Sequence, residues 1–199
     1  MMGTALMTAQ GTKTAFRPPE PRLSETEFLG LAERLPDWSL EYLAGGTLIF
    51  MPPTDPLTSR RNSLIVHRLT AWADPVASVV SGPDGGFLLP DGSRMAPDAA
   101  WFSLPRFEAA QLPGVRFPVF APEFVVELRS PSDRRRGLED KMESWIANGV
   151  QLGWLIDPID RAVTLYRPDR DPEVRSDPGE VPGEGPLVGF ILSMDRILS

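Results

Sequence analysis

Two carboxylates lie in or beside apolar segments, where an acid without a partner is costly. Asp98 directly precedes the apolar run 99–102, and Glu127 interrupts residues 124–128, the most apolar strand-like segment of the chain. Moving an isolated carboxylate out of water is expensive, so each acid needs a partner. A divalent metal ion held jointly by both acids is one partner that also explains why there are two of them. The residues therefore suggest a metal site built on Asp98 and Glu127.

A purely structural interpretation of Glu127 stays open. Side chains alternate along a strand, which puts Arg129 on the same face as Glu127. Glu127 could pair with this arginine, or with one from elsewhere in the chain, and need no metal at all. Spacing alone does not separate an ion pair from a metal site.

Lys141 adds a cation to the candidate site. It lies three residues after Leu138 and four before Trp145, at the edge of the apolar stripe of an expected helix, so its amine can reach inward. The chain has only one other lysine, Lys13, against many arginines. Such a position can reflect a need for a compact amine that the planar arginine fork does not meet. It also fits a lysine whose stem covers apolar surface while the amine stays in water.

Net charge and histidine content restrict the function classes. The formal net charge of −7 argues against a protein whose main function is to bind nucleic acid, although it permits a local basic groove. The run Arg134, Arg135 and Arg136 could contact phosphates close to the metal, or could simply be solvated. With a single histidine, His67, both a Ser-His-Asp hydrolase and a histidine-rich metal site are poorly supported.

The periodicity of the sequence predicts an α/β protein. Ser24 and Glu27 form a capping-box pattern that begins a helix, residues 40–43 and 47–51 predict a hairpin, and a second helix follows over 57–72. Segments 78–81, 86–89 and 95–104 suggest an antiparallel meander, and 105–122 a long loop. A buried strand at 124–128 and a helix ending near 148 lead to strands at 153–156 and 162–166. Residues 169–186 suggest a surface excursion. Strands with interspersed helices favour a mixed sheet flanked by helices.

Composition suggests one cytoplasmic domain. The chain has 42% apolar residues, no cysteine, and no apolar run near the roughly 20 residues of a membrane span. We expect residues 1–22, which are polar and Pro-rich, to be a disordered lead-in, and residues 23–199 to form a single domain.

Several motifs together resemble a known family. They are Pro97-Asp98, the segment 124–133, Lys141, the segments 148–150 and 153–158, the hairpin 40–46 and the ending 187–190. This set is similar to the Uma-type family of putative restriction endonucleases, over about residue 23 to the C-terminus. The resemblance implies a restriction-endonuclease-like fold of the PD-(D/E)XK nuclease superfamily, with a central mixed sheet flanked by helices.

The resemblance also implies roles for individual residues. Asp98 and Glu127 match the two acids that hold Mg²⁺ (or Mn²⁺), and Glu41 matches a glutamate before the glycine turn, although a solvated strand acid fits equally well. The superfamily expects a lysine two residues after the second acid, where this chain has Arg129. Arginine is a poor general base, so we expect Arg129 to steady a phosphate and Lys141 to supply the amine that orients water.

Two functions follow from the resemblance. The first is a metal-dependent DNA endonuclease that hydrolyses phosphodiester bonds, and the second is a catalytically inactive nuclease-fold module for binding or interaction. The acidic net charge and the missing lysine after Glu127 favour the second. For an active enzyme, cutting both strands of a duplex with one site per chain favours a homodimer.

Overall fold

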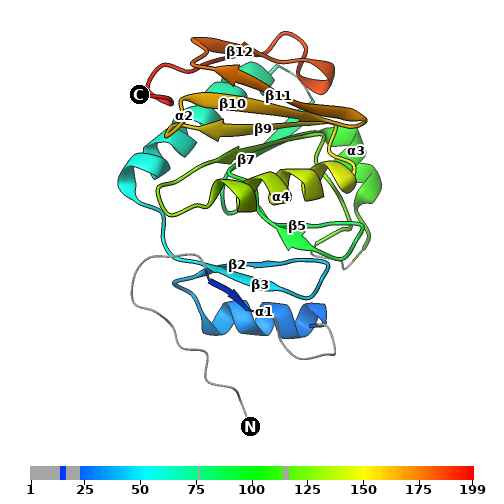
Figure 1. Cartoon of the computed structure of the whole chain (residues 1–199). Helices are drawn as coiled ribbons and strands as arrows, with labels where there is room; N and C mark the ends of the chain where they lie inside the picture. Colours follow the sequence, from blue (N-terminus) through cyan, green and yellow to red (C-terminus); the bar gives the residue numbers. More distant parts are fainter. Residues whose placement is uncertain (1–13, 17–22, 76, 114–116) are drawn as a thin grey trace.

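The computed structural model describes residues 14–16, 23–75, 77–113 and 117–199. Its helices are α1 (Glu25–Arg34), α2 (Pro56–Ala73), α3 (Leu104–Ala110), α4 (Arg135–Ala147) and the short 3-10 helix η1 (Gly185–Leu187). Its strands are β1 (Thr14–Phe16), β2 (Ser39–Tyr42), β3 (Leu48–Met51), β4 (Ser78–Ser81), β5 (Phe87–Leu88), β6 (Arg94–Met95), β7 (Ala99–Ser103), β8 (Phe124–Leu128), β9 (Leu152–Asp157), β10 (Ala162–Arg167), β11 (Arg170–Ser176), β12 (Glu180–Pro182) and β13 (Ile191–Ser193). Figure 1 shows the largest sheet between the β2–β3 hairpin with α1 on one side and β12 on the other. None of the helices described combines the length and the apolarity that crossing a membrane would require.

The largest sheet is the mixed sheet of an α/β fold. Its six strands run in the order β11-β10-β9-β8-β7-β4, and only β8 and β9 are parallel. Two parallel neighbours need a crossover connection, and α4 provides it between β8 and β9. The expected fold class, a mixed sheet with helices packed against it, is confirmed (Figure 1).

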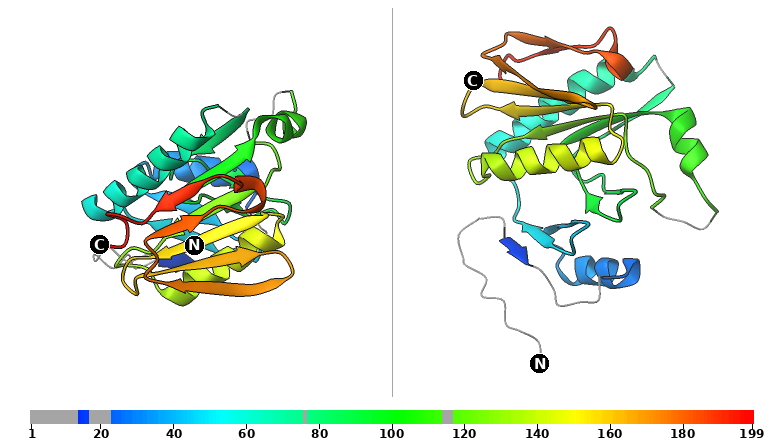
Figure 2. Two further views of the ribbon diagram at one scale, coloured as in Figure 1. Left: turned by 90° about the horizontal axis from the view of Figure 1, so that it is seen from above. Right: turned by 45° about the vertical axis from the view of Figure 1, so that its right-hand side comes forward.

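The two faces of this sheet are covered by different helices. Val126 packs in one core cluster with Ile65 of α2, whereas Val125 packs in another with Met142 of α4. Figure 2 shows α2 and α4 on opposite faces. Because side chains alternate along β8, Glu127 points to the same side as Val125, toward α4.

A second sheet carries the N-terminal hairpin. Its order is β1-β3-β2-β6-β5, and all its pairs are antiparallel. The turn between β2 and β3 contains Gly46 at φ +85, a conformation that favours glycine. Helix α1 begins at Ser24 with the expected capping box, in which the Ser24 hydroxyl accepts from the Glu27 backbone and the Glu27 side chain accepts from the Ser24 backbone.

The expected meander over residues 78–104 is split between the two sheets. Strand β4 pairs with β7 in the large sheet, while β5 and β6 pair with each other and join β2. The two-residue strands β5 and β6 are separated from their neighbours by Gly-rich and Pro-containing segments, which let the chain cross from sheet to sheet. One crossing runs from β6 to β7 and contains Asp98, so this acid lies at the junction of the two sheets.

Three other expectations about local structure missed an element that the structure contains. The expected loop at 105–122 begins with α3, which accommodates Pro105 in its first turn, where no backbone donor is needed. The expected surface excursion at 169–186 contains β11, whose polar side chains remain exposed while its backbone pairs with β10. Within the expected disordered lead-in, Thr14–Phe16 form β1; the rest of residues 1–22 lies outside the described residues.

Candidate active site

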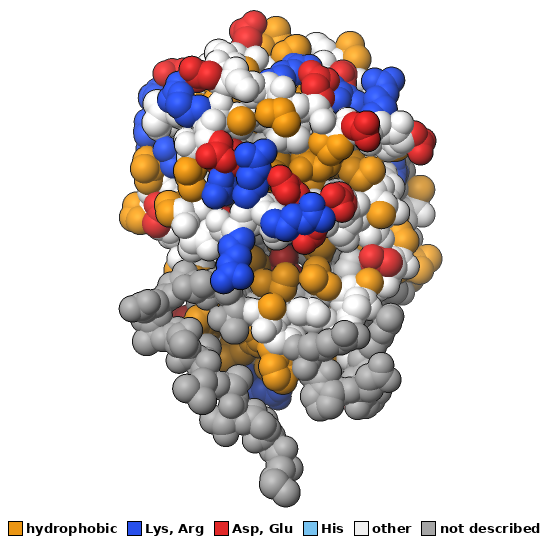
Figure 3. All heavy atoms as spheres, in the orientation of Figure 1, with side chains coloured by type: hydrophobic (Ala, Val, Ile, Leu, Met, Phe, Trp, Pro, Cys, Tyr) orange, Lys and Arg blue, Asp and Glu red, His pale blue; other side chains and the backbone are white. Residues whose placement is uncertain are grey.

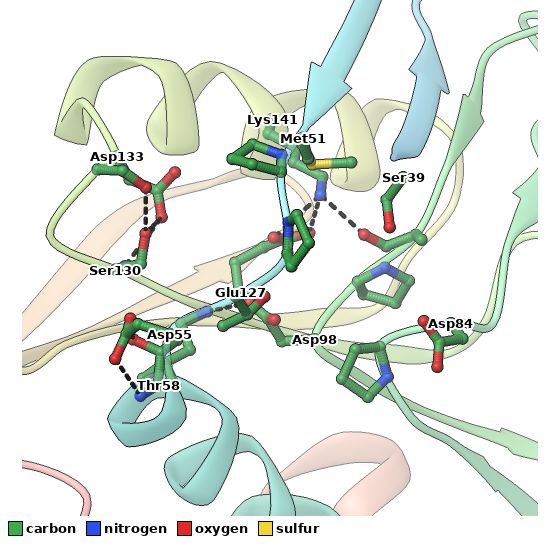
Figure 4. Close-up of a pocket in the computed structure, with 18 of the residues that line it drawn as sticks. Ser39, Met51, Asp55, Thr58, Asp84, Asp98, Glu127, Ser130, Asp133 and Lys141 are labelled. Atoms are coloured by element: carbon green, nitrogen blue, oxygen red, sulfur yellow. Dashed lines mark hydrogen bonds and ion pairs between the residues drawn. The ribbon is translucent and has the colours of Figure 1, made fainter. Parts of the chain in front are cut away.

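A single lysine joins two buried glutamates from different parts of the fold. The Nζ atom of Lys141 lies 2.7 Å from Oε1 of Glu41 and 2.9 Å from Oε1 of Glu127. It also donates to the carbonyl oxygen of Ala96 at 2.8 Å. An ammonium has three N–H donors, and these three acceptors can use all of them. We call Glu41, Glu127 and Lys141 the buried lysine cluster; it links β2, β8 and α4. Figure 4 shows Glu127 and Lys141.

Glu127 is the most deeply embedded acid of this cluster. Glu127 is 2% exposed, and its Oε1 also accepts a hydrogen bond of 2.9 Å from the indole Nε1 of Trp145. Burial raises the pKa of Glu127 to about 7, and the negative charges of Asp98 and Glu41 act in the same direction, while Lys141 acts to lower it. This carboxyl therefore changes its protonation state near neutral pH.

Lys141 is held as an ammonium. Burial alone would lower its pKa, but the charges of Glu127 and Glu41 outweigh burial and raise the pKa above its ordinary value. Glu41 is itself fixed by the backbone N–H of Ala96, which donates to its Oε1 at 2.9 Å. The lysine is therefore placed to donate hydrogen bonds and positive charge, and not to accept a proton.

The pairing of β7 with β8 explains why the two candidate metal ligands meet. Ala99 pairs with Val126 in an antiparallel register. Continuing that register by one residue sets Asp98 opposite Glu127, although 28 residues separate them in the chain. Opposed side chains of paired strands lie within reach of each other. Both carboxylates line the same cavity (Figure 4).

Asp98 is oriented by two hydrogen bonds. Its Oδ2 accepts from the backbone N–H of Leu128 at 2.8 Å, and its Oδ1 accepts from Nδ2 of Asn62 at 2.7 Å. Asn62 was missed in the sequence, although it carried a signal: it falls on the buried stripe of α2, four residues after Thr58 and three before Ile65. A polar residue on a buried helical stripe needs a polar partner, and here the partner is Asp98.

The cavity around these groups has a volume of about 590 Å³ and an acidic lining. Among the described residues that line it, five are acids and one is a base. The acids are Asp55, Asp84, Asp98, Glu127 and Asp133, and the base is Lys141. Glu41 contacts Lys141 but does not line the cavity. Such a lining attracts cations and, without them, repels phosphate.

The donor set suits a hard divalent cation. Asp98 and Glu127 offer only carboxylate oxygens, the ligand type that Mg²⁺ and Mn²⁺ prefer. Within the described part of the chain, no three histidine, cysteine or acidic side chains converge to hold a metal by themselves. Mg²⁺ usually takes only one or two carboxylates from a protein and keeps several waters.

Arg129 does not join the candidate site, contrary to expectation. Leu128 pairs with Ile156, so the next residue along β8 lies beside Asp157 at the end of the parallel strand β9. The Nη1 atom of Arg129 lies 2.7 Å from Oδ2 of Asp157 and 3.2 Å from Oδ2 of Asp160. The guanidinium thus pairs with the neighbouring strand, and Arg129 does not line the cavity.

The expected phosphate-contacting run is largely engaged in ion pairs of its own. Arg135 pairs with Glu139 at 3.0 Å and Asp160 at 2.9 Å, and Arg136 pairs with Asp140 at 2.9 Å. We call Arg129, Arg135 and Arg136, with their acids, the outer arginine cluster; Figure 3 shows basic and acidic side chains intermixed on the face where α4 lies. Arg134 precedes α4, is exposed, and makes no ion pair with any described residue.

Comparisons with known proteins agree with this architecture. A family model for Uma2, described as "Putative restriction endonuclease", matches residues 26–195, well over half of the chain. The chain belongs to the Uma2 family. The matched range contains all three residues of the buried lysine cluster as well as Asp98, so the Uma2 match covers the whole candidate site.

A solved structure similar to this Uma2 chain is described as a "putative nuclease belonging to DUF820" from Anabaena variabilis ATCC 29413. The two sequences are 25% identical, the match covers 87% of this chain and 96% of the other, and the TM-score is 0.73. No curated protein matches the sequence at a significant level. The resemblance to Uma-type proteins expected from the motifs is thus confirmed.

Proposed function

We propose that this protein is a metal-dependent DNA endonuclease that hydrolyses phosphodiester bonds. One observation carries the proposal: a buried lysine, fixed by two glutamates, faces the same cavity as Asp98 at the junction of two sheets. Family membership and the similar structure described as a nuclease support the reaction class.

Asp98 and Glu127 are the proposed ligands for Mg²⁺ or Mn²⁺. A bound divalent ion would supply Lewis-acid polarisation of the phosphate and a more acidic water. Asn62 and the Leu128 backbone fix the Asp98 carboxylate, which reduces the ordering that binding would otherwise require. The raised pKa of Glu127 makes its ligand form dominant only above about pH 7.

Lys141 acts in this proposal as a fixed positive charge. Because its ammonium is stabilised by two glutamates and its three N–H groups already have acceptors, it orients the attacking water or steadies the phosphate through its positive charge and does not remove a proton. Glu41 is a positioning residue, since it touches Lys141 and the Ala96 backbone and does not line the cavity.

The energetics of the cluster favour a functional role. Apolar residues of similar volume in place of a buried ion pair are often neutral or stabilising by about 1–4 kcal/mol. Glu127 and Lys141 share one cavity and have strongly shifted pKa values, a combination typical of catalytic sites.

Incubation with supercoiled, linear and single-stranded DNA, each with Mg²⁺ or Mn²⁺, tests the proposal. We expect cleavage that disappears in EDTA and in Asp98→Ala. Asp157→Asn is the matched control, because that acid belongs to the outer arginine cluster and should leave cleavage intact. Cleavage by Asp98→Ala at the parent rate would contradict the assignment of the site.

A catalytically inactive binding module is the second candidate. The observation that favours it is the acidic lining of the cavity, with five carboxylates against one ammonium among the described residues. In this case the parent protein would cut no nucleic acid with any divalent metal, yet would still bind a partner. The same assay therefore decides between the two functions.

We also propose a homodimer, since a duplex cut in both strands by one site per chain calls for two sites related by a twofold axis. Light scattering at micromolar protein, with and without DNA, is expected to give twice the chain mass of 21.9 kDa. A monomer mass under both conditions would argue against it.

A further inference from the structure

A small aromatic pocket opens beside the acidic cavity. It has a volume of about 150 Å³ and lies between α1, the β5–β6 hairpin and Phe117. Its lining is mostly apolar: Phe28, Leu29, Leu40, Gly86, Phe87, Leu88, Met95, Ala96 and Phe117, with Asp84 and Arg94 as the charged members. Leu40, Asp84, Gly86 and Ala96 also line the acidic cavity, so the two spaces adjoin.

Arg94 is the unusual residue of this pocket. Its Cζ lies 5.3 Å from the centre of the Phe28 ring, and its Nε is buried without a hydrogen-bond partner. Its side chain makes no ion pair or hydrogen bond with any described residue, whereas Arg129, Arg135 and Arg167 all pair with acids. A guanidinium against an apolar wall is expected to need an acceptor, because an unsatisfied buried donor is costly.

We infer that this aromatic pocket binds one unpaired nucleobase of a single-stranded or locally opened nucleic acid. The inference rests on the proposed nuclease function, whose phosphodiester would lie in the adjoining cavity. Aromatic rings and guanidinium planes are the surfaces on which unstacked bases pack, and arginine donors match the carbonyl oxygens of bases.

The size of the pocket agrees with a single planar ring. An engineered cavity of about 150 Å³ in another protein accepts benzene, which is close in size to a pyrimidine ring. Thymine carries two carbonyl acceptors for Arg94 and can stack on its guanidinium plane, which itself lies over the Phe28 ring. A free phosphate would find only one cation among the residues that line the pocket, and it would gain nothing from the aromatic walls.

Fluorescence anisotropy with labelled oligo(dT), in EDTA so that no strand is cut, tests the inference. A strand of the same length with abasic sugars carries the same phosphates without bases. We expect the parent to bind oligo(dT) on the order of 10-fold tighter than the abasic strand, since base stacking contributes at about this level.

Arg94→Met is the main variant, and Arg106→Met is its matched control. Arg106 also lies over a phenylalanine ring, with Cζ 5.7 Å from the centre of Phe120, but it lines neither the pocket nor the cavity. Arg94→Met should reduce oligo(dT) affinity by on the order of 10-fold and leave abasic binding unchanged, whereas Arg106→Met should behave like the parent. Phe28→Leu keeps the site apolar, removes the ring, and should weaken oligo(dT) binding as well.

Three results would overturn the inference: equal affinity of the parent for oligo(dT) and the abasic strand, equal affinity of Arg94→Met and the parent, or competition by inorganic phosphate as effective as competition by thymidine. Melting curves for Arg94→Met and Phe28→Leu establish that both variants are folded. Because the assay needs no cleavage, base binding in a protein that cuts nothing would refute only the proposed function. Cleavage without base preference would refute only this inference.

Discussion

Two clusters, each made of acids paired with bases, use residues that lie close together in the chain. They differ in how far their side chains are exposed to water. The buried lysine cluster uses Glu127 of β8 and Lys141 of α4, while the outer arginine cluster uses Arg129 just past β8 and Arg135 of α4. The side chain of Lys141 is 11% exposed and that of Glu127 2%, whereas Arg135 is 37% exposed and its partner Asp160 47%.

The difference separates the charges of Glu127 and Lys141, which are costly to bury, from those of Arg135 and Asp160, which are partly hydrated. Exposed ion pairs typically contribute 0–1 kcal/mol and are screened by salt, whereas a buried cluster strongly couples the pKa values of its members. The same helix therefore carries one set of charges suited to chemistry and another that mainly covers the surface.

The largest expected difference between the clusters is in the response to losing a cation. Lys141→Met leaves Glu41 and Glu127 buried without their counter-ion, and should lower the free energy of unfolding by roughly 3–5 kcal/mol. Arg135→Met should lower it by about 0–1 kcal/mol. Urea denaturation of both variants measures the contrast.

The rate of DNA cleavage should also fall more in Lys141→Met than in Arg135→Met. Lys141→Met should reduce the rate by roughly 10²-fold or more, the scale of losing one electrostatic contact in a transition state, and Arg135→Met should not change it. Equal effects of the two substitutions on both stability and cleavage would refute the different roles of the two clusters.

The pH dependence of stability should have opposite signs in the two clusters. The pKa of Glu127 is raised from 4.5 to about 7, so the folded state holds this proton more tightly. Its contribution to stability is complete below about pH 4.5 and is lost as pH rises through about 7. Glu127→Gln should remove this decline.

Asp157 shows the reverse behaviour. Burial acts to raise its pKa, but the Asp160 backbone N–H and the Arg129 guanidinium outweigh burial and hold the pKa below its ordinary value of 3.8. Its contribution to stability is present above pH 3.8 and is lost as acid protonates it. Melting temperatures of Glu127→Gln and Asp157→Asn across acidic and neutral pH measure both slopes; slopes of the same sign would refute the contrast.

A smaller effect is expected at Arg129. Arg129→Met removes the side-chain donor of Asp157 and should cost about 1–3 kcal/mol of stability while cleavage is unchanged, because the residue does not line the cavity. Arg129→Lys should retain part of the stability. If Arg129→Met is fully stable but cuts DNA on the order of 10²-fold more slowly, Arg129 contacts the phosphate after all.

The smallest effect is expected at Arg134, which makes no ion pair with the described residues. If it contacts a DNA phosphate, Arg134→Met should weaken binding equally for all sequences and reduce the salt slope by about 1. Arg136→Met is the comparison, since Arg136 is engaged with Asp140. Binding titrations over a range of salt give both slopes, and an unchanged slope in Arg134→Met would exclude the phosphate contact.

The sequence was most informative where local patterns determine structure. The capping box at Ser24, the hairpin around Gly46 and the apolar strand β8 are confirmed, because each depends on neighbouring residues. The placement of Lys141 at the inner edge of α4 is likewise confirmed, since helical spacing alone fixes it relative to Trp145.

Features that depend on distant pairing could not be obtained in this way. No local pattern indicates that β5 and β6 leave the large sheet, a departure that brings Ala96 to Lys141 and Asp98 to the junction. Arg129 was assigned to the site because strand alternation ignores a competing carboxylate on the neighbouring strand. Its partner Asp157 became apparent only with the parallel register of β8 and β9.

Calorimetric titration with Mn²⁺, at a pH above 7 where Glu127 is ionised, measures whether Asp98 and Glu127 bind a metal ion. We expect the parent and Asp157→Asn to bind Mn²⁺ with the same affinity, and Asp98→Asn and Glu127→Gln each to lose binding while remaining folded. Unchanged Mn²⁺ affinity in both Asp98→Asn and Glu127→Gln would contradict a metal site at the junction of the two sheets.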